Sequence, residues 1–153
     1  MLNLNPTELL AWRGFLHTHD TLWKALDAEL DEDGLNLPAY ELLTTLQEAG
    51  TGGLRMTDLA RSLRFSGGGL TRLADKLQTQ GLIERRRCAT DGRGWEALLT
   101  PEGQRKLRRV HARHLRSVRT LFLDRLTPQE TELLAALWAR FQAPAAPGQE
   151  DPE

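Results

Sequence analysis

Basic side chains gather in the middle of the chain. Residues 51–93 hold nine Lys or Arg and four Asp or Glu, a net charge of +5, whereas residues 1–50 hold two and nine, a net charge of −7. The net charge of the whole chain is −1, which alone would argue against a nucleic-acid partner. Because Lys and Arg bind phosphate groups, a basic segment beside an acidic one predicts a single charged functional surface.

Two short helical patterns lie within the basic segment. The first is a helix capped by Thr57, and the second is a helix capped by Ser66 after the dipeptide Arg64-Phe65. Apolar residues repeat at helical spacing in both patterns, namely Leu59, Ala60 and Leu63 in the first and Leu70, Leu73, Ala74 and Leu77 in the second. Two short helices joined by a tight turn predict a helix-turn-helix unit.

The second helix of this unit is where we expect bases to be read. With its apolar face turned inward, the outward residues are Ser66, Gly68, Thr71, Arg72 and Asp75. Arg72 is the long side chain among them that could contact a guanine through two hydrogen bonds. Alternatively, Arg72 pairs with Asp75 or with a phosphate.

Residues 67–69 at the start of this helix are all glycine. Each glycine costs about 1 kcal/mol of helix stability relative to alanine. Because glycine has no side chain, the backbone can approach DNA closely, so we expect fewer direct base contacts and more dependence on DNA shape. The run does not fit a phosphate-binding loop, because Lys76 comes too late and lies inside the helix.

A basic hairpin follows the helix-turn-helix unit. Gly81 ends the second helix, residues 82–88 and 95–99 have strand patterns, and residues 89–94 form the tip. The arginines of the hairpin are Arg85, Arg86, Arg87 and Arg93. Such a wing could contact DNA, or it could be a solvated charged edge. We interpret five basic residues of the lobe as phosphate contacts that position the protein, although any one could be a bystander: Arg55, Arg61, Arg64, Lys76 and Arg86.

Helical segments flank this lobe on both sides. Apolar stripes predict helices over residues 7–30, 38–49, 101–123 and 128–142. The residues expected to begin three of them are Asn5 or Thr7, Thr100 with Pro101, and Thr127 with Glu130. The predicted fold class is therefore mainly α, a winged helix-turn-helix whose N- and C-terminal helices form a dimerisation domain.

These patterns divide the chain into three parts. Residues 1–36 and 101–143 form a helical dimerisation region, because they carry more apolar surface than one small lobe can cover. Residues 37–100 form the winged lobe, and residues 144–153 a disordered, proline-containing tail. Residues 105–119 carry seven bases and no acid. This run could extend the DNA surface, but we prefer a solvated face that complements the acidic first helix within the molecule or across a dimer.

Several stretches follow one another in a distinctive order: Met56-Thr-Asp-Leu-Ala-Arg-Ser-Leu63, Leu70-Thr-Arg-Leu-Ala-Asp-Lys-Leu77, Gly81-Leu-Ile-Glu-Arg85, and Asp91-Gly-Arg93 followed by Leu99-Thr-Pro-Glu-Gly103. With these stretches the chain resembles the MarR family over nearly its whole length. The resemblance implies a regulator of transcription that binds palindromic double-stranded DNA as a homodimer, acting as a repressor that a small-molecule ligand releases. It also implies that Asp91 braces the wing while Arg93 enters a minor groove.

The resemblance further implies a ligand site, because family members often bind small aromatic acids between the dimer helices and the DNA-binding lobe. Suitable groups for a small aromatic or phenolic ligand are Trp12, Arg13, His19 and Trp23. We prefer the alternative that the two tryptophans, at helical spacing, belong to the core. A competing function is a winged-helix module that docks proteins without binding DNA, against which Arg72, Asp91 and Arg93 argue.

Other function classes find little support in the sequence. We expect no enzyme and no cofactor, because the chain has no nucleophile elbow, phosphate-binding loop or metal-ligand spacing. His111 and His114 lie three apart on one helical face, but no cysteine or carboxylate cluster accompanies them. Cys88, the sole cysteine, fits a structural role better than a thiol switch. Without a spanning apolar run or a leader segment, we expect a cytoplasmic protein.

Overall fold

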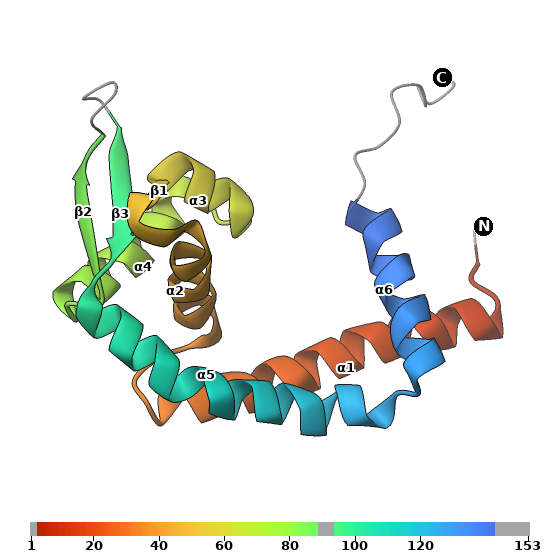
Figure 1. Ribbon diagram of the computed structural model, residues 1–153. Coiled ribbons are helices and arrows are strands. Elements are labelled where there is room, and N and C mark those ends of the chain that lie inside the picture. Colours follow the sequence, from red (N-terminus) through yellow and green to blue (C-terminus); the bar gives the residue numbers. More distant parts are fainter. Residues whose placement is uncertain (1–2, 89–93, 143–153) are drawn as a thin grey trace, which may run out of the picture.

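The computed structural model describes residues 3–88 and 94–142. They form a mainly helical fold with a three-stranded antiparallel sheet of order β1-β3-β2 (Figure 1), which confirms the predicted mainly α, winged helix-turn-helix fold. In chain order the elements are α1 Pro6–Asp31, α2 Leu37–Ala49, the 3-10 turn Gly50–Gly52, β1 Leu54–Arg55, α3 Met56–Ser62, α4 Gly67–Thr79, β2 Ile83–Arg87, β3 Trp95–Leu99, α5 Pro101–Leu121, the 3-10 turn Leu123–Arg125 and α6 Pro128–Gln142. Within this described part, no helix is long and apolar enough to cross a membrane. The predicted tail, residues 144–153, lies outside the described residues.

The winged lobe consists of α2, α3, α4 and the sheet. Its helices bury apolar side chains that recur every three or four positions, because that spacing places them on one face. The side chains that meet in its core, each at most 2% exposed, include Leu43 and Leu46 of α2, Leu59 of α3, Leu70 and Leu77 of α4, Ile83 of β2 and Ala97 of β3. This shared core packs α4 against both α3 and the sheet.

The long helices α1 and α5 leave the lobe and pack against each other (Figure 1). Near this contact Leu30 of α1 is fully buried. The last helix, α6, lies beside the N-terminal half of α1, where the ring of Trp138 is 5.6 Å from the ring of Phe15. The lobe and α6 therefore lie at opposite ends of α1.

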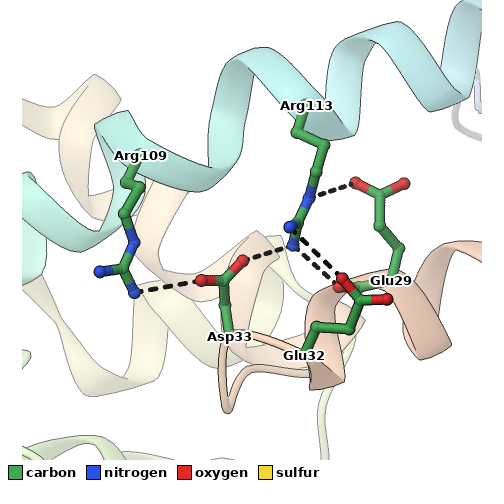
Figure 2. Close-up of polar contacts among 5 residues, drawn as sticks. All are labelled: Glu29, Glu32, Asp33, Arg109 and Arg113. Carbon is green, nitrogen blue, oxygen red and sulfur yellow. Dashed lines mark hydrogen bonds and ion pairs between the residues drawn. The ribbon is translucent and has the colours of Figure 1, made fainter.

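An ionic cluster joins the end of α1 to α5 (Figure 2). The Arg113 Nε donates a hydrogen bond to the Glu29 carboxylate (3.3 Å), and its Nη1 lies 3.4 Å from a Glu32 carboxylate oxygen. The Arg113 Nη2 donates to the Glu29 carbonyl (3.0 Å) and to the Asp33 carboxylate, which also accepts from Arg109 (3.1 Å). These contacts confirm, within the chain and for these two arginines, that the basic run of α5 complements the acidic end of α1.

Local capping rules account for most helix starts. The side chain of Asn5 accepts a hydrogen bond from the Glu8 backbone N–H (2.9 Å), and the Glu8 carboxylate accepts one from the Asn5 backbone N–H (2.7 Å). Thr127 and Glu130 form the same reciprocal pair at the start of α6. Ser66 caps α4 through its hydroxyl, as predicted.

The start of α3 differs from the prediction. The sequence predicts Thr57 as its cap, but this is wrong: α3 begins at Met56, and Arg55 occupies the cap position without a capping side chain. The reason is the short strand β1, in which Leu54 and Arg55 pair with Ala97 and Glu96 of β3. The chain passes directly from this strand into the helix, and a two-residue strand leaves no alternating pattern in the sequence.

The first turn of α5 lies against the corner between α4 and β2. Gly81 at that corner has a φ of +71°, a conformation that glycine adopts easily. The Thr100 hydroxyl donates a hydrogen bond to the Gly81 carbonyl (2.6 Å), and the Thr100 backbone N–H donates to the Leu82 carbonyl (3.1 Å). A Cβ at Gly103 would lie 2.0 Å from the Leu82 carbonyl oxygen. We call these four residues the α5 joint.

We predict that Gly103→Ala lowers the free energy of unfolding by roughly 1 to 3 kcal/mol, because the added methyl overpacks the α5 joint. The matched control is Gly68→Ala in the first turn of α4, where an added Cβ would meet nothing within 4 Å. That control should keep the stability or raise it by up to about 1 kcal/mol, since alanine favours helix. Urea denaturation followed by circular dichroism measures both, and equal stability of the two variants would contradict the joint.

Candidate nucleic-acid interface

The helix α4 presents the outward face that the sequence predicts. Its inward side chains Leu70, Ala74 and Leu77 are at most 1% exposed. The predicted base-reading residues Ser66, Gly68, Thr71 and Arg72 are all exposed, and so are Asp75 and Lys76. The first turn of α4 is open to solvent at Gly68, where no atom would contact an added Cβ. A helix with this exposed polar face has the form of a recognition helix.

Arg72 lies on this face with its side chain available. Among the described residues, Arg72 forms no ion pair, whereas Asp75, its proposed alternative partner, is bound by Arg85 of β2 (2.5 Å). The interpretation that Arg72 merely pairs with Asp75 is therefore wrong. An exposed guanidinium on a recognition helix can donate two parallel hydrogen bonds to guanine.

The wing is a regular two-stranded hairpin whose arginines have different surroundings. The pairing register places Arg86 opposite Glu96, and the Arg86 Nε donates to the Glu96 carboxylate (3.3 Å). The guanidinium of Arg87 lies 4.6 Å from the centre of the Trp95 ring, a cation–π contact. The side chain of Arg86 remains 53% exposed. The predicted wing-tip residues Asp91 and Arg93 lie outside the described residues.

The other predicted phosphate contacts come from β1, α3, the turn and α4. Arg61 is 80% exposed and pairs with Asp58 one turn earlier on α3 (3.1 Å). Arg64 in the turn and Lys76 on α4 are exposed, and Arg64 has a φ of +54°. Arg55 on β1 is partly buried. Arg61, Arg64 and Lys76 therefore offer their charge to solvent around the helix-turn-helix unit, and Arg55 does so less.

The predicted ligand residues lie at exposed positions along α1, between Trp12 and Trp23. Trp12 is 53% and Trp23 39% exposed, so the interpretation of these tryptophans as core residues is wrong within one chain. The ring of Phe15 lies 6.1 Å from Trp12 and 6.3 Å from His19, and His19 lies 5.8 Å from Trp23. We call these four residues the α1 aromatic ladder. Arg13 is exposed beside it.

A hollow of about 350 Å³ between α1 and the end of α5 was not foreseen from the sequence. Its lining residues are His17, Thr18, Thr21, Leu22, Ala25, Leu121, Phe122, Arg125 and Leu126. None of the four predicted ligand residues lines it, because helical spacing places them on another side of α1. No local sequence pattern predicts such a hollow, because its position depends on where α5 crosses α1.

Comparison with known proteins settles the family. The MarR family profile matches residues 33–94. The crystal structure of AbsC, a MarR family transcriptional regulator from Streptomyces coelicolor, is 34% identical with a TM-score of 0.88, and the match covers 93% of this chain and 97% of AbsC. The chain belongs to the MarR family.

Two further MarR-type relatives extend this comparison. Sco3205, a MarR family transcriptional regulator from Streptomyces coelicolor solved in complex with DNA, is 33% identical with a TM-score of 0.89, and the match covers 95% of this chain and 93% of Sco3205. The transcriptional repressor MprA of Escherichia coli K12 is 31% identical over 103 residues, which are 67% of this chain. That match spans only 58% of the length of MprA.

The two C-terminal histidines of this MarR-family chain pack on one tyrosine. The ring of His114, which is 6% exposed, lies 4.2 Å from that of Tyr40, and the Tyr40 hydroxyl shares a hydrogen bond of 2.7 Å with the Nδ1 of His111. The His114 Nδ1 has no hydrogen-bond partner among the described residues. Burial lowers the pKa of His114, while Glu29 raises it and His111 lowers it by smaller amounts. In the same described part, no three His, Cys, Asp or Glu side chains are grouped to hold a metal.

Cys88 lies at the end of β2 and is 3% exposed. Its backbone N–H donates a hydrogen bond to the Gly94 carbonyl (3.0 Å) and so continues the pairing of the hairpin. A buried thiol at the base of the wing tip fits the structural role expected from the sequence.

We predict that stability of this MarR-family chain falls as the pH drops below about 6.5, the ordinary pKa of histidine. Because the folded chain keeps His114 neutral, the unfolded chain binds one more proton between the lowered pKa and the ordinary one. The contribution of neutral His114 to the free energy of unfolding is complete above the ordinary pKa. It is lost as the pH falls toward the lowered pKa, and the free energy of unfolding then drops by up to about 1.4 kcal/mol per pH unit.

Urea titrations between pH 8 and 5 should show this slope in the native chain and a flatter one in His114→Phe. The control His17→Gln, at an exposed histidine, should keep the native slope. Parallel curves for the native chain and His114→Phe would contradict this assignment.

Proposed function

We propose that this chain is a MarR-type transcriptional regulator that binds palindromic double-stranded DNA as a homodimer. The observation that carries the proposal is the exposed face of α4 beside a basic wing, with an Arg72 that forms no ion pair among the described residues. Support also comes from Sco3205, which is 33% identical over nearly its whole length and was solved with DNA. We infer a repressor role from the relative MprA, which is a transcriptional repressor. We infer a non-enzymatic role from membership of the MarR family.

In this proposal the contacts divide into reading and positioning groups. Arg72, with Ser66, Gly68 and Thr71, lies in the major groove, where Arg72 reads a guanine. The basic side chains of the lobe contact phosphates: Arg55, Arg61, Arg64, Lys76 and Arg86. By family resemblance, Arg93 at the wing tip enters a minor groove and Asp91 braces it. The open backbone at Gly68 lets α4 approach the DNA closely.

The dimer in this proposal is formed by residues 1–36 and 101–143, with residues 37–100 as the DNA-binding lobe. The evidence is a set of large apolar side chains on α1 and α6 that the chain itself does not cover. Their exposed fractions are 74% for Leu10, 53% for Trp12, 43% for Phe15, 46% for Leu16, 62% for Leu133, 39% for Trp138 and 80% for Phe141. An exposed apolar patch of this kind marks a protein interface. Two copies related by a two-fold axis would cover both patches at once.

A small aromatic or phenolic ligand completes the proposal. The α1 aromatic ladder offers ring faces, and Arg13 offers a positive charge for a carboxylate or phenolate. Trp12, Arg13, His19 and Trp23 would then hold the ligand beside the partner subunit. Binding there would change the distance between the two recognition helices and release the operator.

The dimer predicts a mass of two chains in light scattering at micromolar concentration. Phe141→Asp should shift the equilibrium toward monomer by about tenfold or more, because a buried charge replaces a ring in the interface. Since Phe141 is 80% exposed in one chain, its replacement should leave the fold intact. The control is Trp95→Asp, at a 45% exposed ring on β3, outside the residues proposed to form the dimer. A native monomer, or equal effects of the two substitutions, would contradict the proposed interface.

The DNA contacts predict different losses for Arg72 and Arg86. With DNA that the native protein selects from a random pool, Arg72→Ala should cost roughly 1 to 3 kcal/mol and relax discrimination at one base pair of each half-site. Arg86→Ala should weaken all sequences alike and lower the salt slope by about one per subunit. Arg93→Ala should weaken binding mainly to A/T-rich flanks, and Asp91→Ala should do so in part.

Titrations against selected, half-site-mutated and random DNA separate these effects. The native protein should lose about 10³-fold in affinity between 50 and 200 mM salt if a dimer contacts six to ten phosphates. Equal losses for Arg72→Ala and Arg86→Ala on all three DNAs would show that α4 does not read bases. A flat salt response would favour a protein-docking module instead.

A further inference from the structure

Arg85 of the wing is turned toward the recognition helix. Its Nε donates a hydrogen bond to the side-chain oxygen of Gln78 (2.7 Å), and its Nη2 donates to the Asp75 carboxylate (2.5 Å). Both acceptors lie on α4, three residues apart, so they form one edge of the helix. The Arg85 side chain is 21% exposed, against 53% for Arg86 beside it. Arg85 therefore uses these donors for contacts with α4.

The strand geometry explains this orientation. Successive side chains of β2 point to opposite faces, so Arg85 shares a face with Ile83, which is 2% exposed in the core. Arg86 lies on the other face and pairs with Glu96 of β3. Arg85 pairs in register with Ala97 at the centre of the sheet. Arg85 thus lies beside a residue that is paired on both sides, because Ala97 also pairs with Leu54 of β1.

The contact bridges the corner at which α4 meets the wing. The chain leaves α4 at Thr79, turns at Gly81 with a φ of +71° and enters β2 at Ile83. A tight turn alone fixes the distance between the two elements but leaves their mutual angle less constrained. Two hydrogen bonds from one planar guanidinium to two turns of α4 restrict that angle.

Asp75 also matters for the charge of the recognition face. Its side chain is 56% exposed on the same helix as Arg72, three residues away. An unpaired carboxylate there would repel the phosphates of bound DNA. The pairing with Arg85 offsets this charge while using the carboxylate as an anchor.

We propose that Arg85, Asp75 and Gln78 form a clamp that sets the angle between the recognition helix and the wing, with Arg85 acting as a positioning residue and not as a phosphate contact. This inference rests on the proposed DNA-binding function. The clamp holds α4 and the wing together as one rigid unit. With their angle fixed, α4 can contact the major groove while the wing contacts the adjacent groove. Its loss should therefore reduce specific binding far more than nonspecific binding.

A double-mutant cycle tests the clamp. The variants are Asp75→Ala, Arg85→Met and their combination, titrated against DNA selected by the native protein and against random DNA at several salt concentrations. Each single variant should bind the selected DNA about tenfold more weakly, and the double variant no more weakly than either single one. Binding to random DNA should change by less than about threefold, and Arg85→Met should keep the native salt slope.

The direction in which Asp75→Ala changes DNA affinity distinguishes the two roles of Asp75 most clearly. Removing a carboxylate that only repels phosphates would tighten binding to every DNA, whereas removing a clamp residue weakens binding to the selected DNA. Tighter binding by Asp75→Ala, additive losses in the double variant, or a salt slope lowered by Arg85→Met would each overturn the clamp. The control Arg86→Met removes the same charge from the opposite face of the strand and should lower the salt slope.

A second measurement separates the clamp from folding and from the proposed function. In the free protein, hydrogen exchange at the last turn of α4 and along β2 should become about tenfold faster in each single variant, and no faster in the double variant. Unchanged exchange in both single variants would overturn the clamp even if DNA binding is lost. If the native protein selects no DNA, the proposed function fails, and the exchange data alone decide the clamp.

Discussion

The contact between Gly103 and the Leu82 carbonyl is the constraint on which the placement of the recognition helix depends. A Cβ at that position would lie 2.0 Å from the carbonyl oxygen, so α5 approaches the corner after α4 this closely because residue 103 has no side chain. Thr100 adds hydrogen bonds to the Gly81 and Leu82 carbonyls. Because α5 also packs along α1, the α5 joint couples the flanking helices directly to the end of α4, the proposed recognition helix. Any rotation of α5 about its axis must move the corner below α4.

The surface charge of this chain depends on which charged side chains form ion pairs as well as on how many there are. The net charge of −1 arises because an acidic first third offsets a basic middle. Part of the acidic charge is already matched inside the molecule, where Glu29 and Asp33, each 16% exposed, bind arginines of α5. The lobe keeps much of its positive charge open to solvent. Local pairing thus allows a nearly neutral protein to carry a strongly basic surface.

Sequence patterns predicted what local rules control. The caps at Asn5, Ser66 and Thr127, the helix stop at Gly81 and the hairpin follow from residues within a few positions of one another. Strand β1 was missed, because two residues carry no periodicity and its partner is about 40 residues away in the chain. The partner of Asp75 could not be identified either: the sequence offered Arg72 on the same helix, whereas Arg85 comes near Asp75 only through the path of β2. The exposure of Trp12 and Trp23 depends on what one chain leaves uncovered, and helical spacing cannot report this.

The distribution of the tryptophans gives the molecule two separate optical reporters. Trp12, Trp23 and Trp138 lie on α1 and α6, each between 39% and 53% exposed, whereas Trp95 lies on the wing beneath the Arg87 guanidinium. Indole emission moves to shorter wavelength when the ring leaves water. The bulk of the intrinsic fluorescence therefore responds to events at the flanking helices, and the smaller share from Trp95 to events at the wing. Replacing Trp95 by phenylalanine would leave a chain whose emission reports only on the flanking helices.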